Sequence, residues 1–342
     1  MLTTDNDYSS VERAFASSTG QDLWRVAGNP LVDPRVDETL SVVIASFNGH
    51  STLPATLASL QRQCYRNFEL VLVDDGSRTS LIELVSEVGL SVPVTVVRII
   101  DNRGLSVARN VGVQCAEGNT VVFIDDDMLM PPTMTYSLAL RQAHTIGCVF
   151  VGFREDVSGE IFFDPKARQP RINGDWRFQT THDADSRVFL AADQGAPRSE
   201  RRTFTPVAET ANFKKLGNGC VVGSWDLPGM VIGHSICSKK RDIITAGGFA
   251  EGRFHGWGVE DLAFGALMTA RGHFIVPALE WVSFHLRHQG RKVSRADEWK
   301  EMQRNFERYL HYVQEPVGDQ RFPYHRIRSV QAAGTRILGV LD

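Results

Sequence analysis

TVVFIDDDMLMP, residues 120–131, joins an apolar run to three consecutive carboxylates. Thr120 to Ile124 have the length and composition of a buried strand, and Asp125, Asp126 and Asp127 follow at its end. Like charges crowded at a strand terminus repel one another unless a cation neutralises them. A hard divalent ion, Mn²⁺ or Mg²⁺, carrying a phosphate-bearing ligand is the partner that this pattern favours, and a solvated acidic loop is the simpler alternative.

Strand-like and helix-like segments alternate along residues 39–150. Apolar runs typical of strands lie at 41–47, 69–74, 94–100 and 120–124, and helical spacing of apolar residues follows at 51–64, 81–88 and 105–115. Strands separated by single helices form right-handed βαβ units. We therefore predict an α/β fold with a doubly wound, mostly parallel sheet flanked by helices. Ligands bind such sheets at the carboxyl ends of the strands, where the three aspartates lie.

Composition narrows the class of protein. A chain of 342 residues, 42% apolar and 23% charged, suits one elaborated domain or two. Its net charge of −3 argues against a nucleic-acid partner, which would require a basic excess. The five cysteines are odd in number and scattered, so we expect reduced core residues: Cys64, Cys115, Cys148, Cys220 and Cys237. Without a signal peptide or a long apolar run, we expect a cytoplasmic protein with no transmembrane segment; the oligomeric state stays open.

Four motifs occur in one order along the first half of the chain. They are Val-Ile-Ala-Ser-Phe-Asn at 43–48, Val-Asp-Asp-Gly-Ser at 73–77, Asn-Arg-Gly-Leu-Ser-Val-Ala-Arg-Asn at 102–110, and the aspartate triplet. The turn after the first strand is not Gly-x-Gly-x-x-Gly and no P-loop occurs, which argues against a dinucleotide or P-loop fold. The ordered set resembles the nucleotide-sugar-binding half of the family 2 glycosyltransferases, which have the GT-A fold.

This resemblance implies a nucleotide-sugar donor, a UDP-sugar above all. It places the nucleobase beside Asp75, with Ser46 and Phe47 as its walls. The resemblance implies further contacts to the nucleotide sugar from Asn48, Arg103, Gly104, Arg109, Asp126 and Trp257. Asp125 and Asp127 match the family's Asp-x-Asp metal motif, although another alignment would include Asp126.

Some of these residues have structural alternatives. Phe47 equally suits a core aromatic, and a turn in which an aspartate bonds its own backbone needs only one of Asp74 and Asp75. Arg109 falls among apolar helix neighbours, where a guanidinium needs a partner. That partner is a diphosphate, a carboxylate of the triplet, or another nearby aspartate.

A second constellation, Gly-Gly-Phe at 247–249 and His-Gly-Trp-Gly-Val-Glu-Asp at 255–261, lies in the second half. Apolar spacing from Leu262 onward predicts a helix, so Glu260 and Asp261 stand at its N-terminus, where acids also complement the helix dipole. Trp-Gly-x-Glu-Asp resembles the acceptor-site motif of metal-dependent GT-A transferases such as chondroitin polymerases and β-galactosyltransferases. The resemblance implies that Asp261 is the general base and that Glu260 acts beside it.

Two histidines, His285 and His288, end a strand-like run that begins at Trp281. In related transferases a histidine at this point joins the Asp-x-Asp motif as a metal ligand. Residues three apart on a strand point to opposite faces, so at most one of the two is a ligand unless a turn intervenes, and we prefer His285.

The predicted organisation has five parts: an N-terminal extension (1–38), a nucleotide-sugar-binding half (39–150), a long insertion that is either a lid or a structural addition (151–219), a smaller acceptor-side half (220–292) and a C-terminal helical tail (293–342). The sequence predicts a metal-dependent glycosyltransferase of the hexosyltransferase type, inverting by resemblance, that acts on a small-molecule or glycan acceptor. The alternatives are a sugar-phosphate nucleotidyltransferase and a catalytically inactive nucleotide-sugar-binding partner.

Overall fold

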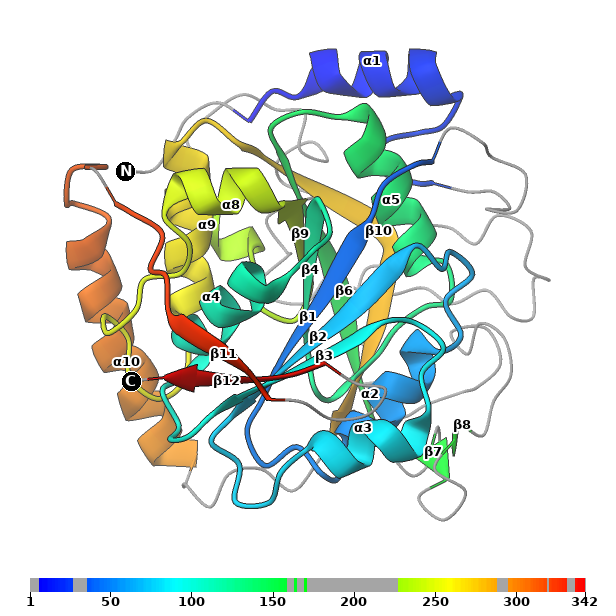
Figure 1. Ribbon diagram of the computed structural model, residues 1–342. Helices are drawn as coiled ribbons and strands as arrows, with labels where there is room; N and C mark the ends of the chain where they lie inside the picture. The colour runs from blue at the N-terminus through cyan, green and yellow to red at the C-terminus, as the bar shows by residue number, and fades with distance from the viewer. Residues whose placement is uncertain are drawn as a thin grey trace.

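The computed structural model describes residues 6–26, 36–158, 163–164, 169–170, 227–287, 295–318, 320–330 and 336–341. Within these residues the central sheet contains ten strands: β1 (Leu40–Ser46), β2 (Phe68–Asp75), β3 (Val94–Ile99), β4 (Thr120–Asp125), β5 (Met128–Leu129), β6 (Cys148–Ser158), β9 (Ile236–Lys239), β10 (Phe274–Arg287), β11 (Arg326–Val330) and β12 (Arg336–Leu341). Their order is β11-β12-β3-β2-β1-β4-β9-β6-β10-β5 (Figure 1). A separate pair is formed by β7 (Phe163–Asp164) and β8 (Gln169–Pro170).

The sheet is mixed but mostly parallel. Strands β12, β3, β2, β1 and β4 pair in parallel, as do β6 and β10. Strand β9 runs antiparallel between β4 and β6 and joins the two parts. This architecture confirms the predicted doubly wound α/β fold.

Helices cover both faces of the sheet. The helices that do so are α1 (Ser9–Thr19), α2 (Leu53–Leu60), α3 (Ile82–Val88), α4 (Leu105–Cys115), α5 (Met134–His144), α8 (Lys240–Ala246) and α9 (Glu260–Ala270). Helix α10 (Arg295–Tyr312) packs outside α9, and a short 3₁₀ turn, η5 (Pro228–Met230), precedes β9. One core cluster packs α4, α8 and α9 against side chains such as Val43, and the other packs α1, α2, α3 and α5 against Val42 and Ile44. Successive residues of β1 thus enter opposite cores, which explains why its sequence is continuously apolar.

Two expectations about the second half need correction. The apolar composition of residues 231–237 predicts a strand over that whole run, but only Ile236–Lys239 is one. The backbone N–H of Gly233 instead donates a hydrogen bond to the side chain of Asp261. The tail 293–342 was expected to be helical, yet after α10 it adds β11 and β12 to the sheet. The alternation in Arg-Ile-Arg-Ser-Val at 326–330 is typical of such an edge strand.

Several expectations lie outside the described residues. These include His288, Cys220 and, apart from β6, β7 and β8, the insertion at 151–219, for which a lid and a structural addition were the two alternatives. In the described part of the chain, every helix is too short or too polar to span a membrane.

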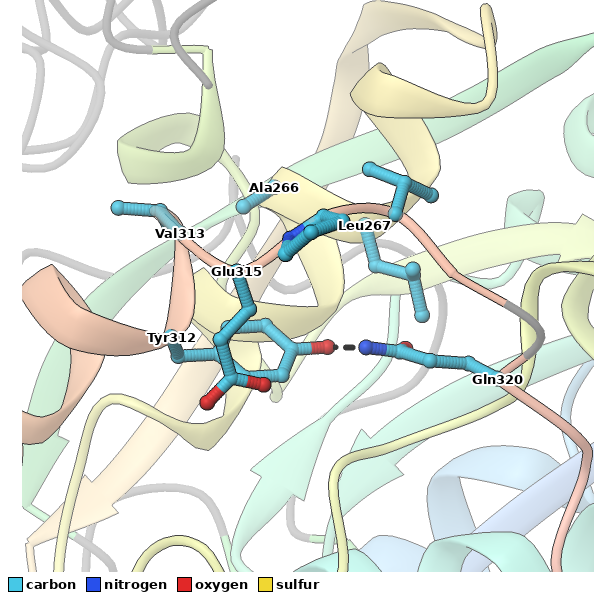
Figure 2. Close-up of a pocket in the computed structure, with 8 residues that line it drawn as sticks. Ala266, Leu267, Tyr312, Val313, Glu315 and Gln320 are labelled. Atoms are coloured by element: carbon cyan, nitrogen blue, oxygen red, sulfur yellow. Dashed lines mark hydrogen bonds between the residues drawn. The ribbon is translucent and has the colours of Figure 1, made fainter.

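Helix α10 and the segment after it pack against α9. Figure 2 shows Tyr312, Val313, Glu315 and Gln320 around Ala266 and Leu267 of α9. The hydroxyl of Tyr312 donates a hydrogen bond of 3.2 Å to Gln320. The cavity left between these elements is about 10 Å³, close to the smallest space that holds one water, so this is a packed junction.

Candidate active site at the carboxyl edge of the sheet

Three of the predicted site residues are the last residues of neighbouring strands. Ser46, Asp75 and Asp125 end β1, β2 and β4, which lie side by side in parallel. The carboxyl ends of these strands therefore bring the first, second and fourth motifs to one edge of the sheet.

The turn after β1 is built against the aspartate triplet. The Ser46 hydroxyl donates to Oδ2 of Asp126, and the Thr56 hydroxyl donates to the Asp126 carbonyl at 3.0 Å. A Cβ at Gly49 would overlap the Asp126 carboxylate, so only glycine permits this close approach. Asp126 thus fixes the turn, which is a structural role in addition to the predicted nucleotide-sugar contact.

The structure distinguishes the two aspartates of the second motif. Asp74 is fully buried, bonds Arg98, and accepts the N–H of Ser77 at 3.0 Å, so it is the residue that makes the turn. Asn48, which has φ 59°, connects the turn after β1 to the turn after β2. Its backbone N–H donates a hydrogen bond of 2.8 Å to the Ser77 hydroxyl.

Asp75 instead holds the start of α4. Its two carboxylate oxygens accept the N–H groups of Arg103 and Gly104, each at 2.8 Å. Burial raises the pKa of Asp75, and these two hydrogen bonds oppose the rise. Each oxygen keeps a second lone pair, so the carboxylate still has capacity to accept a bond from a ligand.

Three predicted nucleotide-sugar contacts are exposed side chains. Phe47 is 51% exposed, which excludes the alternative of a core aromatic. Arg103 is exposed beside Asp75, and Trp257 is 44% exposed in the loop before α9. These three side chains are accessible to a ligand.

Arg109 connects the first half of the chain to the second. Its Nη1 lies 3.0 Å from Oε1 of Glu260, and its Nη2 lies 3.3 Å from Oδ1 of Asp125. The guanidinium is buried over the ring of Phe249, with Cζ 5.3 Å from the ring centroid. Burial opposes its charge, but the carboxylates of Glu260, Asp125 and Asp261 raise the pKa of Arg109. The partner left open by the sequence is therefore a carboxylate of the triplet, together with Glu260.

Asp261 is held in the first turn of α9. Its Oδ2 accepts the N–H of Gly233 at 2.9 Å, and its Oδ1 accepts the N–H of Leu262 at 2.8 Å. Burial, followed by the neighbouring charge of Glu260, raises the pKa of Asp261 to about 7. A carboxylate with a pKa near neutrality is suited to act as a general base.

Of the predicted metal ligands, Asp127 and His285 lie close together, whereas Asp125 contacts Arg109. Nε2 of His285 lies 3.0 Å from Oδ2 of Asp127, because the antiparallel pairing of β5 and β10 sets His285 opposite Met128. Asp125 turns toward Arg109; burial raises the pKa of Asp125, and the charge of Asp127 adds to the rise. Within the described residues, no three His, Cys, Asp or Glu side chains are gathered closely enough to hold a metal ion by themselves.

Gly233 and His234, which lie between η5 and β9, are not among the site residues that the sequence predicts. A Cβ at Gly233 would overlap the guanidinium of Arg109. His234 is buried, with Nδ1 2.7 Å from the Ser235 hydroxyl, and burial followed by the charge of Arg154 lowers the pKa of His234 well below its usual value. The signal was the Gly-His-Ser that interrupts the apolar run at 231–237.

Comparison with known families and proteins agrees with this architecture. The model of "Glycosyl transferase family 2" matches residues 41–199. Chondroitin synthase from Escherichia coli is 26% identical over 285 residues, which cover 80% of this chain and 39% of that protein. Hyaluronan synthase from Pasteurella multocida is 23% identical over 255 residues, 74% of this chain and 25% of that protein.

Another relative is similar over a shorter stretch. An uncharacterised glycosyltransferase from Haemophilus influenzae is 40% identical over 93 residues, 27% of this chain and 31% of that protein. The chain therefore spans less than half the length of these relatives. The crystal structure of GalNAc-T7 with UDP, GalNAc and Mn²⁺ has a TM-score of 0.53 and 20% identity, covering 84% of this chain and 53% of that one, which shows a shared GT-A fold.

Proposed function

We propose, from the match of the glycosyl transferase family 2 model to residues 41–199, that the protein transfers a sugar from a nucleoside-diphosphate sugar to an acceptor hydroxyl. The proposal includes dependence on a divalent cation and inversion at the anomeric carbon. A UDP-sugar is the proposed donor, and a small molecule or a glycan is the proposed acceptor. UDP in the GalNAc-T7 structure supports this choice of donor.

The observation that carries the proposal is the position of Arg109. One buried guanidinium contacts both Asp125, at the end of β4, and Glu260, at the start of α9. Donor-side and acceptor-side motifs that are far apart in the sequence therefore lie within one side chain's reach. A transfer reaction requires this proximity, since the two reactants must be held together.

A cation would be held by Asp127 and His285, with Asp125 beside them. The carboxylate oxygens of this donor set suit Mn²⁺ or Mg²⁺. Mg²⁺ in particular keeps several waters and completes its shell with substrate phosphates, so a complete protein cage is not required. When bound, the ion would supply positive charge to the departing diphosphate. The Mn²⁺ in the GalNAc-T7 structure supports this assignment.

The donor would lie along the carboxyl edge of the sheet. Asp75 and the exposed ring of Phe47 would contact the nucleobase, and Ser46 and Asn48 shape the turn beside it. Arg103 is exposed at the start of α4 and would lie against the diphosphate.

Asp261 would act on the acceptor. Its carboxylate would take the proton of the acceptor hydroxyl while the hydroxyl oxygen bonds to the anomeric carbon. The bond from that carbon to the diphosphate oxygen would break, and its electron pair would leave with the diphosphate. Attack from the face opposite the leaving group inverts the configuration. Glu260 would act indirectly, since it holds the charge of Arg109 beside the site.

A panel of nucleotide sugars tests the proposal. We expect one of them to raise the unfolding temperature with Mn²⁺ or Mg²⁺ but not with a chelator, because binding at about 100 times Kd adds about 2.7 kcal/mol. Release of the nucleoside diphosphate in the presence of acceptor would then identify a transferase. Protection without turnover would indicate a binding partner, and pyrophosphate release from a nucleoside triphosphate and a sugar phosphate would indicate a nucleotidyltransferase.

A further inference from the structure

The loop that carries Trp257 has an unfavourable backbone. Gly256 and Gly258 have φ values of 76° and 89°, and Val259 has φ 81°. A β-branched residue in the left-handed region is an outlier, and such a conformation persists only where the surrounding structure determines it. The loop at 255–259 therefore requires support from outside its own sequence.

Helix α10 provides that support through Asn305. This side chain is fully buried, and its Nδ2 lies 2.9 Å from the carbonyl oxygen of His255, 3.1 Å from that of Trp257 and 3.2 Å from that of Gly258. Its Oδ1 accepts a bond from Nη1 of Arg308 at 2.9 Å, which fixes the orientation of the amide. An amide supplies both the donor and the acceptor that this position needs.

Glu301, one turn earlier on α10, binds a backbone N–H group of the same loop. Oε2 of Glu301 accepts the N–H of Trp257 at 3.1 Å. A Cβ at Gly256 would overlap the Glu301 carboxylate, so the glycine is required for this close approach as well as for its φ. The loop is thus bonded to α10 through its carbonyls and through an N–H.

Packing extends the attachment to the first turn of α9. Val259 and Ala263 form one buried cluster with Tyr309 and Tyr312 of α10. Figure 1 shows α10 beside α9 at the side of the molecule. Displacement of α10 would therefore affect both the Trp257 loop and the position of Asp261, which is in that first turn.

We propose that Asn305 and Glu301 are positioning residues for the acceptor side of the site. They hold the loop at 255–258 so that Trp257 stays exposed and Asp261 stays against Gly233. The inference rests on the proposed function, because that function assigns this loop to the acceptor.

Hydrogen exchange of the whole chain tests the attachment without any substrate. Asn305→Ala removes the hydrogen bonds between α10 and the loop carbonyls, so local opening of the loop costs less free energy. Exchange of the amides at 255–259 should therefore become roughly tenfold faster or more. Glu301→Ala should speed exchange at Trp257, and Glu301→Gln, which keeps an oxygen acceptor, should restore it. Gln303→Ala, at an exposed position of the same helix, is the matched control and should change nothing. If Asn305→Ala does not fold, the comparison of Glu301→Ala with Glu301→Gln provides the test. Unchanged exchange in the folded variants would contradict the inference that α10 holds the loop at 255–259.

Kinetics test the positioning role. Glu301→Ala should raise the KM for acceptor about five- to tenfold while donor Kd stays within about twofold, and Glu301→Gln should recover most of the loss. Faster loop exchange with an unchanged acceptor KM would overturn positioning and leave the proposed function intact. If wild-type protein turns over no nucleotide sugar, the proposed function fails and the acceptor role fails with it, while the exchange data still decide the attachment.

Discussion

The guanidinium of Arg109 and the carboxylate of Glu260 form a buried ion pair, with 3.0 Å between Nη1 and Oε1. The two residues belong to α4 and α9, which lie on the same face of the sheet. Removal of one partner would leave the other charge buried and uncompensated. The pair therefore ties the stability of the fold to the geometry of the candidate site.

Arg109→Gln should lower the free energy of unfolding by about 3–5 kcal/mol, the usual cost of breaking a buried pair from one side. Denaturant unfolding measures this change. Arg336→Gln removes an exposed pair with Glu117 and serves as the control, expected within about 1 kcal/mol of wild type. Equal effects of the two substitutions would contradict the importance given to burial.

Asp127→Asn should abolish most metal-dependent turnover and weaken nucleoside-diphosphate binding, because a neutral amide is a poorer ligand for a hard cation. His285→Ala should raise the metal concentration needed for half-maximal activity. Titration of Mn²⁺ and Mg²⁺ against turnover measures both effects. Wild-type metal dependence in a folded Asp127→Asn variant would remove Asp127 from the metal site.

Asp261→Asn should reduce turnover by about 10²–10⁴, because the amide cannot accept a proton, while donor affinity stays near wild type. Turnover and calorimetric donor binding are measured on the same preparation. Glu260→Gln is the comparison: it should mainly lower stability through the loss of the charge opposite Arg109. Turnover of Asp261→Asn at the wild-type rate would make the Glu-Asp pair a purely structural helix start.

The raised pKa of Asp261 predicts opposite pH effects on rate and stability. Turnover should rise as pH increases through about 7, where the carboxyl loses its proton. Between the ordinary value of 3.8 and about 7, the folded carboxyl keeps a proton that the unfolded one releases. Its contribution to stability is therefore complete below that window and is lost as pH rises through it. Rate profiles and denaturant unfolding across this range check both signs, and Asp261→Asn should remove the stability component.

Gly49→Ala should weaken donor binding and lower stability by about 1–3 kcal/mol, since the new methyl group would overlap Asp126 and Ser46. Gly339→Ala, where a Cβ meets no atom within 4 Å, is the control and should be close to neutral. Donor affinity and unfolding temperature of the two variants are compared. An unaffected Gly49→Ala variant would show that the first turn moves freely.

The sequence predicted the strands that carry the first-half motifs because local composition encodes them. Apolar runs ending in Ser46, Asp75 and Asp125 identify buried parallel strands and their carboxyl ends. Local patterns do not encode which distant segments meet. The division of roles between Asp74 and Asp75 depends on Arg98 of the next strand and on the start of α4, so it required the three-dimensional arrangement.

The part of the candidate site in the second half of the chain was less predictable for the same reason. Gly233 approaches Asp261 only because a loop replaces half of the expected strand at 231–237. Asn305 and Glu301 lie on a helix whose own sequence shows no sign of the loop that they bind. The expectation of a purely helical tail failed because pairing of β12 with β3 is a long-range choice that the apolar pattern permits but does not require.

The parallel pairing of β12 with β3 has a consequence for how the chain folds. During synthesis, one edge of β3 pairs with β2, but the N–H and C=O groups of its other edge stay unpaired until residues 336–341 have left the ribosome. Until then the nascent sheet has an exposed edge, which is a template for pairing with other chains. Chaperone demand and inclusion-body formation should therefore depend on how soon β12 is translated and pairs with β3.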